Sequence, residues 1–239
     1  MNQVFSIPLF ATNPHACNYL SGESAQTAFV HPSFSMNTNI YAQLISQGFR
    51  RSGDDVYQNI CVACAACIPA RVHVDAFTPN RMQRRCQKKN SEVKAYVLPN
   101  RFKQEHYDLY LRYQKYKHPD SSMQHSSAEE YIHFLGSSWC DTYFVEFRLQ
   151  DTLIAVTIID LLPQALSAVY TFFNPDYEHL SPGTYAVLWQ LAHAKALHLP
   201  WLYVGYWIKN CRKMRYKNQY QPLQILTENG WQDYQAASD

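Results

Sequence analysis

Basic side chains recur at spacings of three and four between residues 78 and 90, with no acidic residue among them. Thr78 can cap a helix there, and such a helix gathers the cations on one side within about two turns. Cations concentrated in this way bind a polyanion such as RNA chiefly through its phosphates, although a solvated helix face would show the same pattern. The residues concerned are Arg81, Arg84, Arg85, Lys88 and Lys89.

Two other segments combine cations with glycine or aromatic residues. In residues 48–53, Arg50 and Arg51 lie between glycines, and backbone amides and guanidinium groups could converge there on a phosphate. The same pattern is typical of a solvated hairpin tip. Residues 205–217 offer aromatic rings for an unstacked base and cations for its phosphate. The RNA-contacting candidates in this second segment are Trp207, Lys209, Lys213 and Lys217.

Cys61, Cys64 and Cys67 have the spacing of metal or cluster ligands, and Cys17 is the candidate for a fourth ligand. A closed site normally shows two CxxC pairs, whereas Cys17 stands alone. The residues between the three thiols are apolar, which suits buried cysteines equally well. We therefore expect no bound metal and no other cofactor. Seven cysteines, an odd number, argue against a disulfide framework and fit a reducing compartment.

The elements that must position these residues are clearest between residues 143 and 206. Runs rich in Val, Ile, Thr, Tyr and Phe predict strands, and short polar segments predict the turns between them. A helix is predicted where Ser181 can serve as the N-cap with Pro182 at the first position. The predicted strands are 143–149, 152–160, 165–173 and 201–206, and the helix is 182–197.

Three antiparallel strands, a crossover helix and a strand at its foot form the order of the acyl-transferring half of the GNAT fold. We therefore predict an α+β, GNAT-like acyltransferase fold with a mixed, mostly antiparallel, splayed sheet flanked by helices. Two strands would part, and an acyl donor would lie in the gap with its phosphate near Ser181 and Gly183 at the helix N-terminus. A similar sheet without any chemistry is the alternative.

Length and composition set wider limits. The chain has 239 residues, 47% of them hydrophobic and 17% charged, which is typical of a globular protein. Polar residues 118–127 mark a boundary between an N-terminal domain, 1–120, with the cysteines and the basic helix, and a transfer domain, 121–239, in a fused double-domain arrangement. There is no long apolar run, so we expect a cytoplasmic protein without a membrane partner. A net charge of +2 does not indicate DNA binding.

Several motifs together resemble the bacterial arginyltransferase family. They are residues 17–20, residues 48–53, the cysteine run up to Arg71, residues 166–173 and residues 205–208, and the resemblance extends from Phe10 to Trp231. It is strongest to the leucine-transferring subgroup. It implies transfer of leucine from leucyl-tRNA to the N-terminal Asp or Glu of a protein, which marks that protein for degradation through the N-degron pathway. Eukaryotic relatives bind an iron-sulfur cluster or zinc with a second cysteine where Leu20 stands here.

The implied reaction needs an aligned amine and a stabilised oxyanion, because an aminoacyl ester is already activated. Asp160, at a predicted strand end, could accept the amine proton, although it could equally be a turn residue. Tyr170 or Thr171 would face the gap because side chains alternate along a strand, and Tyr206 completes the catalytic candidates. The acidic acceptor needs a cation. Arg148 and Arg71 are the candidates for that partner.

Three other functions remain open. Arginine could replace leucine as the transferred amino acid, since pocket residues cannot be separated from core residues in a sequence. A CoA-dependent N-acyltransferase would share the sheet but usually has a glycine-rich loop, whereas residues 180–185 hold one glycine. A non-enzymatic RNA-binding module with a zinc knob would explain the cysteines and the basic helix, but leaves residues 143–206 without a role.

Overall fold

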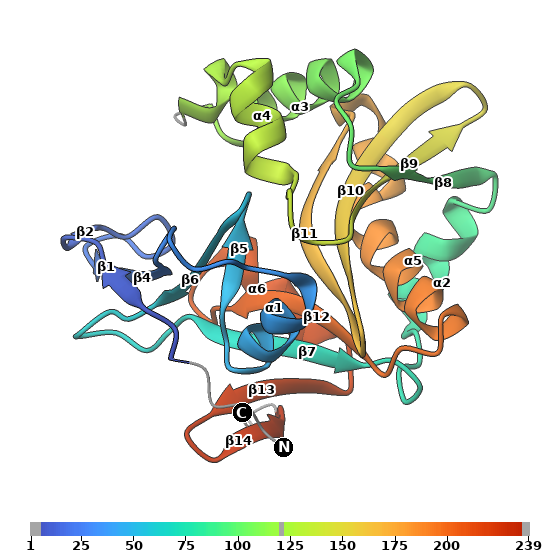
Figure 1. Cartoon of the computed structure of the whole chain (residues 1–239). Coiled ribbons are helices and arrows are strands. Elements are labelled where there is room, and N and C mark those ends of the chain that lie inside the picture. The colour runs from blue at the N-terminus through green and yellow to red at the C-terminus, as the bar shows by residue number, and fades with distance from the viewer. Residues whose placement is uncertain (1–5, 120–121, 236–239) are drawn as a thin grey trace.

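The computed structural model describes residues 6–119 and 122–235, and a sheet of eight strands forms the centre of this part of the chain (Figure 1). The strands are β7 (Ile68–His73), β8 (Val93–Pro99), β9 (Thr142–Leu149), β10 (Thr152–Leu162), β11 (Ala165–Phe173), β12 (Trp201–Trp207), β13 (Leu223–Thr227) and β14 (Gly230–Asp233). Their order across the sheet is β14-β13-β7-β12-β11-β10-β9-β8. β11 and β12 run parallel, and all other neighbours are antiparallel.

The strand-and-helix order predicted between residues 143 and 206 is confirmed. β9, β10 and β11 form a meander, α5 (Pro182–Ala196) crosses over, and β12 returns beside β11. One detail differs at the helix start. Ser181 adopts a left-handed conformation (φ 55°) and its side chain makes no capping hydrogen bond, so Pro182 alone pre-sets the first turn.

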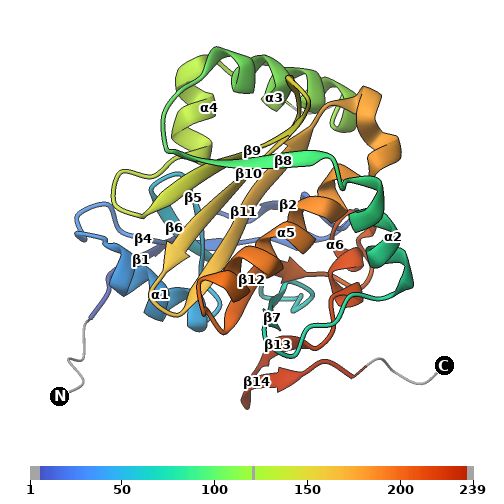
Figure 2. The same ribbon diagram turned by 90° about the vertical axis from the view of Figure 1, so that its right-hand side faces the viewer.

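Helices cover both faces of the large sheet (Figure 2). α3 (Gln104–Lys117) and α4 (Ala128–Leu135) lie on one face, where Tyr110, Tyr131 and Leu135 pack against Phe144 and Phe172. α5 and α2 (Arg81–Lys89) lie on the other face. The sheet is therefore buried on both sides, which explains why its central strands are nearly continuous apolar runs.

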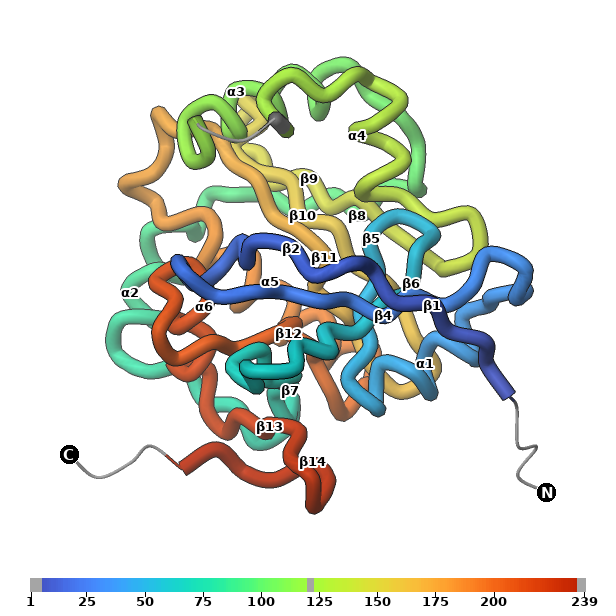
Figure 3. The backbone as a smooth tube through the Cα atoms, turned by 90° about the vertical axis from the view of Figure 1, so that its left-hand side faces the viewer, coloured from blue at the N-terminus to red at the C-terminus, as the bar shows by residue number. Residues whose placement is uncertain are grey.

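A smaller sheet and a helix pack on the same face of the large sheet as α4 (Figures 1 and 3). The small sheet has the order β1 (Leu9–Ala11), β4 (Thr27–Val30), β6 (Asp55–Asn59) and β5 (Arg50–Ser52). α1 (Thr38–Ser46) buries Tyr41, Leu44 and Ile45 against residues of β10, β11 and β12. A short hairpin joins β2 (His15–Ala16) to β3 (Ser24–Ala25).

The remaining described elements are short. They are three 3-10 turns, η1 (Ser122–His125), η2 (Pro175–Leu180) and η3 (Tyr216–Gln219), and one helical turn, α6 (Arg212–Arg215). None of the helices in the described part of the chain is both long enough and apolar enough to cross a membrane.

The predicted boundary at residue 120 does not divide the sheet. β8 pairs with β9, and β7 pairs with both β12 and β13, so strands from both sides of the boundary are neighbours. Val72 and Val93 also belong to the same hydrophobic core as Phe147. The segments 1–120 and 121–239 thus contribute to one shared sheet and one shared core.

Candidate acyl-transfer site where two strands part

β11 and β12 are paired only over Ala165–Ser167 and Trp201–Tyr203, and they separate beyond that point. Each strand carries an unmatched residue next to the separation, Val169 in β11 and Val204 in β12. Gly205, the residue after the second bulge, has a φ of 80°. An extra residue bends a strand and increases its twist, so the two bulges account for the separation. The predicted splayed sheet is therefore present, between β11 and β12.

Arg50 reaches from β5 to the point where the strands separate. Its Nη2 donates to the backbone oxygen of Ala168 (2.6 Å) and its Nη1 donates to Ser167 Oγ (3.3 Å). The residue is 9% exposed. Arg50 was predicted to lie in a phosphate-binding loop, but it is instead held at the edge of β11.

Lys217 approaches the same place from the side of β12. Its Nζ donates to the backbone oxygen of Tyr206 (2.7 Å), and the residue is 7% exposed. Burial, together with the nearby charge of Arg50, lowers the pKa of Lys217 to about 7. A Cβ at Gly205 would lie 3.4 Å from Lys217 Nζ and 3.5 Å from Arg50 Nη2. The two cationic groups therefore converge on one point, which glycine leaves free of a side chain.

Arg51 and Asp160 form a buried ion pair and not a catalytic or phosphate-binding site. Arg51 Nη2 and Nε lie 2.6 and 2.8 Å from the two carboxylate oxygens of Asp160, and Thr142 Oγ1 donates to the same carboxylate (2.7 Å). The Arg51 and Asp160 side chains are 1% and 0% exposed. Because fixed donors surround the carboxylate, Asp160 is not available as a base, and Arg51 is not available for a tRNA phosphate.

The three hydroxyl groups predicted to be catalytic form hydrogen bonds inside the protein. Tyr170 points toward α3 and accepts a hydrogen bond from Gln114 (2.9 Å). Thr171 Oγ1 is 2.7 Å from Thr157 Oγ1, beneath α5. Tyr206 is 3% exposed and donates to the backbone oxygen of Gly48 (3.2 Å). Strand side chains point above and below the sheet, whereas the gap lies in its plane, so the gap is bordered by backbone and the prediction for these residues does not fit.

The two arginines predicted to bind the acceptor are both held by other side chains. Arg148 Nε donates to Glu146 (2.7 Å), and its Nη2 pairs with Glu105. The Arg71 guanidinium lies between the rings of Trp201 (3.7 Å) and Trp231 (4.3 Å) and donates twice to Gln224 (2.9 and 3.1 Å). Arg148 is thus neutralised by carboxylates, whereas Arg71 is held between two rings without a carboxylate partner among the described residues.

The basic helix is present, and it lies beside the start of α5. Asn80, and not Thr78, is its N-cap and forms a capping box with Gln83. Asn90 Nδ2 donates to the backbone oxygen of Leu180 (2.8 Å), which ties the end of α2 to the residue before Ser181. A Cβ at Gly183 would meet no atom within 4 Å, so the first turn of α5 is open. The five cations of α2 are all exposed, namely Arg81, Arg84, Arg85, Lys88 and Lys89.

In residues 205–217, the tryptophan predicted to stack on a tRNA base is buried. Trp207 is 5% exposed, packs on Tyr234 (ring centroids 4.9 Å apart) and donates to the backbone oxygen of Arg215. Lys209 is exposed, and Lys213 is exposed with its Nζ 3.1 Å from His118 Nδ1. Lys217 is buried between β12 and Arg50, so among the predicted lysines of this segment Lys209 and Lys213 remain exposed to a phosphate at the surface.

Comparison with known proteins agrees with the geometry. Residues 15–85 match the family description "Arginine-tRNA-protein transferase, N terminus" and residues 105–227 match "Arginine-tRNA-protein transferase, C terminus". The chain belongs to this transferase family. Aspartate/glutamate leucyltransferases of Pseudomonas savastanoi pv. phaseolicola and Pseudomonas aeruginosa are each 46% identical to it over 231 residues, which is 97% of this chain and 98% of theirs. The resemblance seen in the motifs is thereby confirmed.

Solved structures similar to this transferase are more distant. A structure titled L-PGS from Bacillus licheniformis is 11% identical, with a TM-score of 0.46, and the match covers 70% of this chain and 49% of that one. A likeness at this level carries no conclusion. The assignment of a mixed sheet with flanking helices therefore rests on the strand order and pairing of this chain alone.

Four cysteines of the transferase were predicted to lie near one another. Cys17, Cys61, Cys64 and Cys67 are all free and partly buried. Burial, with a smaller contribution from the three other thiols close by, raises the pKa of Cys67 to about 11, although a hydrogen bond with Asn59 acts in the opposite direction. Within residues 6–119 and 122–235, no three His, Cys, Asp or Glu side chains are arranged to hold a metal ion.

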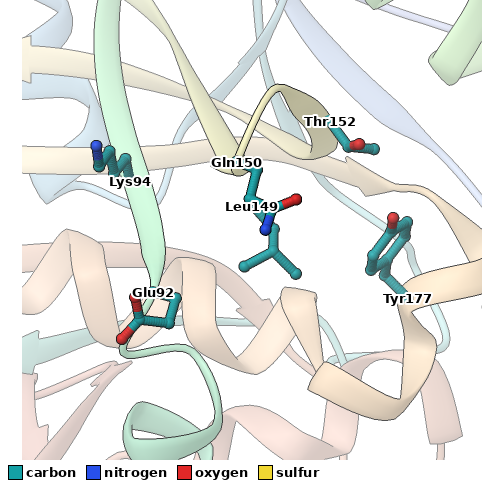
Figure 4. A pocket seen from close by; sticks show the side chains of 6 residues that line it. All are labelled: Glu92, Lys94, Leu149, Gln150, Thr152 and Tyr177. Carbon is teal, nitrogen blue, oxygen red and sulfur yellow. The ribbon is translucent and has the colours of Figure 1, made fainter.

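A hollow of about 350 Å³ lies elsewhere, beside the β9–β10 turn (Figure 4). Glu92 and Lys94 from the start of β8 line it, together with Tyr177 of η2 and residues of the turn. It contains none of the residues that surround the β11–β12 separation, and its lining shows no paired catalytic groups.

Sequence reasoning missed Ser167, the two bulges and the convergence on Gly205. Ser167 is an ordinary strand residue in the sequence, and a bulge leaves no residue pattern apart from an occasional glycine. Gly205 was the one available signal, because a glycine within a predicted strand marks a bulge or a close approach of another group.

Proposed function

We propose that this protein transfers leucine from leucyl-tRNA to proteins that begin with Asp or Glu, which marks them for degradation. The identity of 46% over 97% of the chain to aspartate/glutamate leucyltransferases carries the proposal. The donor is a charged tRNA, so we place the reaction in the cytoplasm. The parted strands and the exposed basic helix supply surfaces for the acyl group and for the tRNA.

The tRNA surface in this proposal consists of α2 and the first turn of α5. Exposed cations on α2 would pair with phosphates of the acceptor stem, and the open helix start near Gly183 would favour a further phosphate. Lys89 Nζ lies 3.3 Å from the backbone oxygen of His179, directly before α5. The two features therefore form one continuous surface on the α2 and α5 side of the sheet.

The chemistry in this proposal takes place in a GNAT-like gap between β11 and β12. The α-amine of the acceptor attacks the ester carbon of leucyl-tRNA, an amide bond forms, and the C–O bond to the terminal ribose breaks. The amine proton leaves with the ribose oxygen as a hydroxyl group. No strand pairs with β11 beyond Ser167 on this side, among the described residues, so its backbone can donate to the oxyanion. An α-amine with a pKa of about 7.7–8.0 is partly neutral near pH 7 and needs no strong base.

A transfer assay tests the proposal. Purified protein is mixed with labelled leucyl-tRNA, arginyl-tRNA or acetyl-CoA, and with peptides that begin with Asp, Glu or Ala. We expect label to pass from leucyl-tRNA to the Asp and Glu peptides only. Transfer from arginyl-tRNA in its place would change the donor, and acetyl transfer without leucyl transfer would overturn the proposal.

A further inference from the structure

We propose that Arg50 and Lys217 form the binding site for the side-chain carboxylate of the acceptor's first residue. This proposal rests on the proposed function and names the residues that would select the acceptor. Three features of the β11–β12 separation support it: buried cations without counter-ions, unused hydrogen-bond donors, and a location next to the gap.

Neither cation has a counter-ion. Among residues 6–119 and 122–235, neither Arg50 nor Lys217 takes part in an ion pair with a carboxylate, although both are more than nine-tenths buried. Burying a cation is costly unless an anion compensates it. The same chain shows the compensated arrangement at Arg51, which is paired with Asp160. A buried arginine beside a buried lysine, with no anion among the described residues, therefore favours a ligand that supplies the negative charge, and the lowered pKa of Lys217 fits a site whose anion is not yet bound.

Both cations also have donors to spare. Arg50 Nη1 and Nη2 each use one hydrogen on Ser167 and Ala168, which leaves one N–H on each nitrogen and the Nε–H. Lys217 Nζ contacts the Tyr206 oxygen and the Met214 sulfur (3.6 Å), which leaves a third hydrogen. Arg50 Nη2 and Lys217 Nζ lie 3.5 and 3.4 Å from the position that a Cβ would take at Gly205. The two nitrogens are therefore close enough for the two oxygens of one carboxylate to accept from both.

The location of the two cations favours the acceptor over the tRNA. Arg50 is attached to β11 and Lys217 to β12, so the site lies at the vertex of the separation in which the ester would be attacked. A side-chain carboxylate bound there fixes the α-amine of the same residue within a few bonds. A phosphodiester of tRNA is bulkier and would have to enter a nearly closed site, whereas the exposed α2 cations already offer a phosphate surface.

Binding and transfer of matched peptides test this site. The peptides begin with Asp or with its neutral isostere Asn and are otherwise identical. Lys217→Met removes the charge with little change of shape, Arg50→Lys keeps the charge but loses the fork, and Lys209→Met is the matched control on the exposed part of the same segment. Peptide affinity is measured by fluorescence anisotropy without tRNA, leucine transfer is measured separately, and thermal unfolding verifies the fold of each variant.

We expect wild-type protein and Lys209→Met to prefer the Asp peptide, and the Asp-to-Asn affinity ratio to fall about tenfold or more in Lys217→Met and to fall in Arg50→Lys. If Lys217→Met does not fold, the Asp-to-Asn affinity ratio of Arg50→Lys alone tests the site. An unchanged ratio in a folded variant would overturn the site, and so would a loss of leucyl-tRNA affinity with the ratio intact. Failure of the wild-type protein to transfer leucine concerns the proposed function and leaves the peptide ratio as an independent result.

Discussion

Arg50 and Arg51 are neighbours in one short strand and both are buried, yet their surroundings differ in one respect. Arg51 meets the carboxylate of Asp160, the hydroxyl of Thr142 and three backbone oxygens. Among the described residues, Arg50 donates only to a hydroxyl and a backbone oxygen. The two arginines attach β5 to adjacent points of the large sheet, because Asp160 in β10 and Ser167 in β11 are paired across these neighbouring strands.

The difference separates a structural cation from one that awaits a ligand. A buried arginine whose donors are saturated by a carboxylate contributes to the fold, because its removal leaves a buried charge unpaired. A buried arginine next to a buried lysine, with donors to spare, keeps its charge for a binding partner. Residue type alone does not distinguish them.

The largest expected effect is on stability. Arg51→Met should lower the free energy of unfolding by about 3–5 kcal/mol, because Asp160 is left as an unpaired charge at 0% exposure. Arg50→Met should cost clearly less, because it leaves no carboxylate unpaired and the loss of two hydrogen bonds is offset by removal of an uncompensated buried charge. Urea unfolding of both variants measures the two values. Equal losses would contradict the contrast between the two arginines.

The next effect is on tRNA affinity. Alanine at Arg84, Arg85 and Lys88 should weaken tRNA binding and lower the log-log slope against salt by roughly 0.7–0.9 for each phosphate that the variant no longer binds. Alanine at Lys94, Arg101 and Lys115, which are exposed on other parts of the chain, serves as the control with the same change of charge. Filter binding at several salt concentrations gives the slopes. A flatter slope only in the control would move the tRNA surface away from α2.

A smaller effect should appear in the pH dependence of stability. The Glu146 carboxylate is buried but bonded to Arg148, Lys103 and His106, and these bonds lower its pKa from 4.5 to about 2. A lowered folded-state pKa stabilises the protein above the unfolded value, and this contribution is lost as pH falls from about 5 to about 2. Glu146→Gln should flatten that part of the stability profile measured by thermal unfolding. An unchanged acid limb would mean that other carboxylates govern it.

The smallest expected effect concerns metal. We predict that the isolated protein contains no stoichiometric zinc and that a chelator leaves leucine transfer unchanged within about twofold, because Leu20 stands where Cys17 would need a CxxC partner and the residues between the other three thiols are apolar. Elemental analysis and an anaerobic absorption spectrum measure this. About one zinc per chain, or an iron-sulfide band that air removes, would make Cys17 a ligand.

The sequence predicted the meander, α5 and β12 well because their apolar runs and turn residues are local signals. It also located the basic helix, whose spacing is local too. It could not assign Asp160 or Arg51, because the partners lie 109 residues apart and a charged residue looks the same whether its partner is in the protein or in a ligand. The bulges at Val169 and Val204 were likewise invisible, since register is set by pairing between distant segments.

The most direct test compares Arg50→Met with Arg148→Met in a competition between Asp-starting and Asn-starting peptides for leucine from leucyl-tRNA. Arg148 was one of the two sequence-based candidates for acceptor binding, but carboxylates neutralise it, whereas Arg50 has no carboxylate partner within residues 6–119 and 122–235. We predict that the Asp-to-Asn product ratio falls about tenfold or more in Arg50→Met and stays at the wild-type value in Arg148→Met. A ratio that survives in Arg50→Met and falls in Arg148→Met would contradict the assignment of Arg50 as the acceptor's partner.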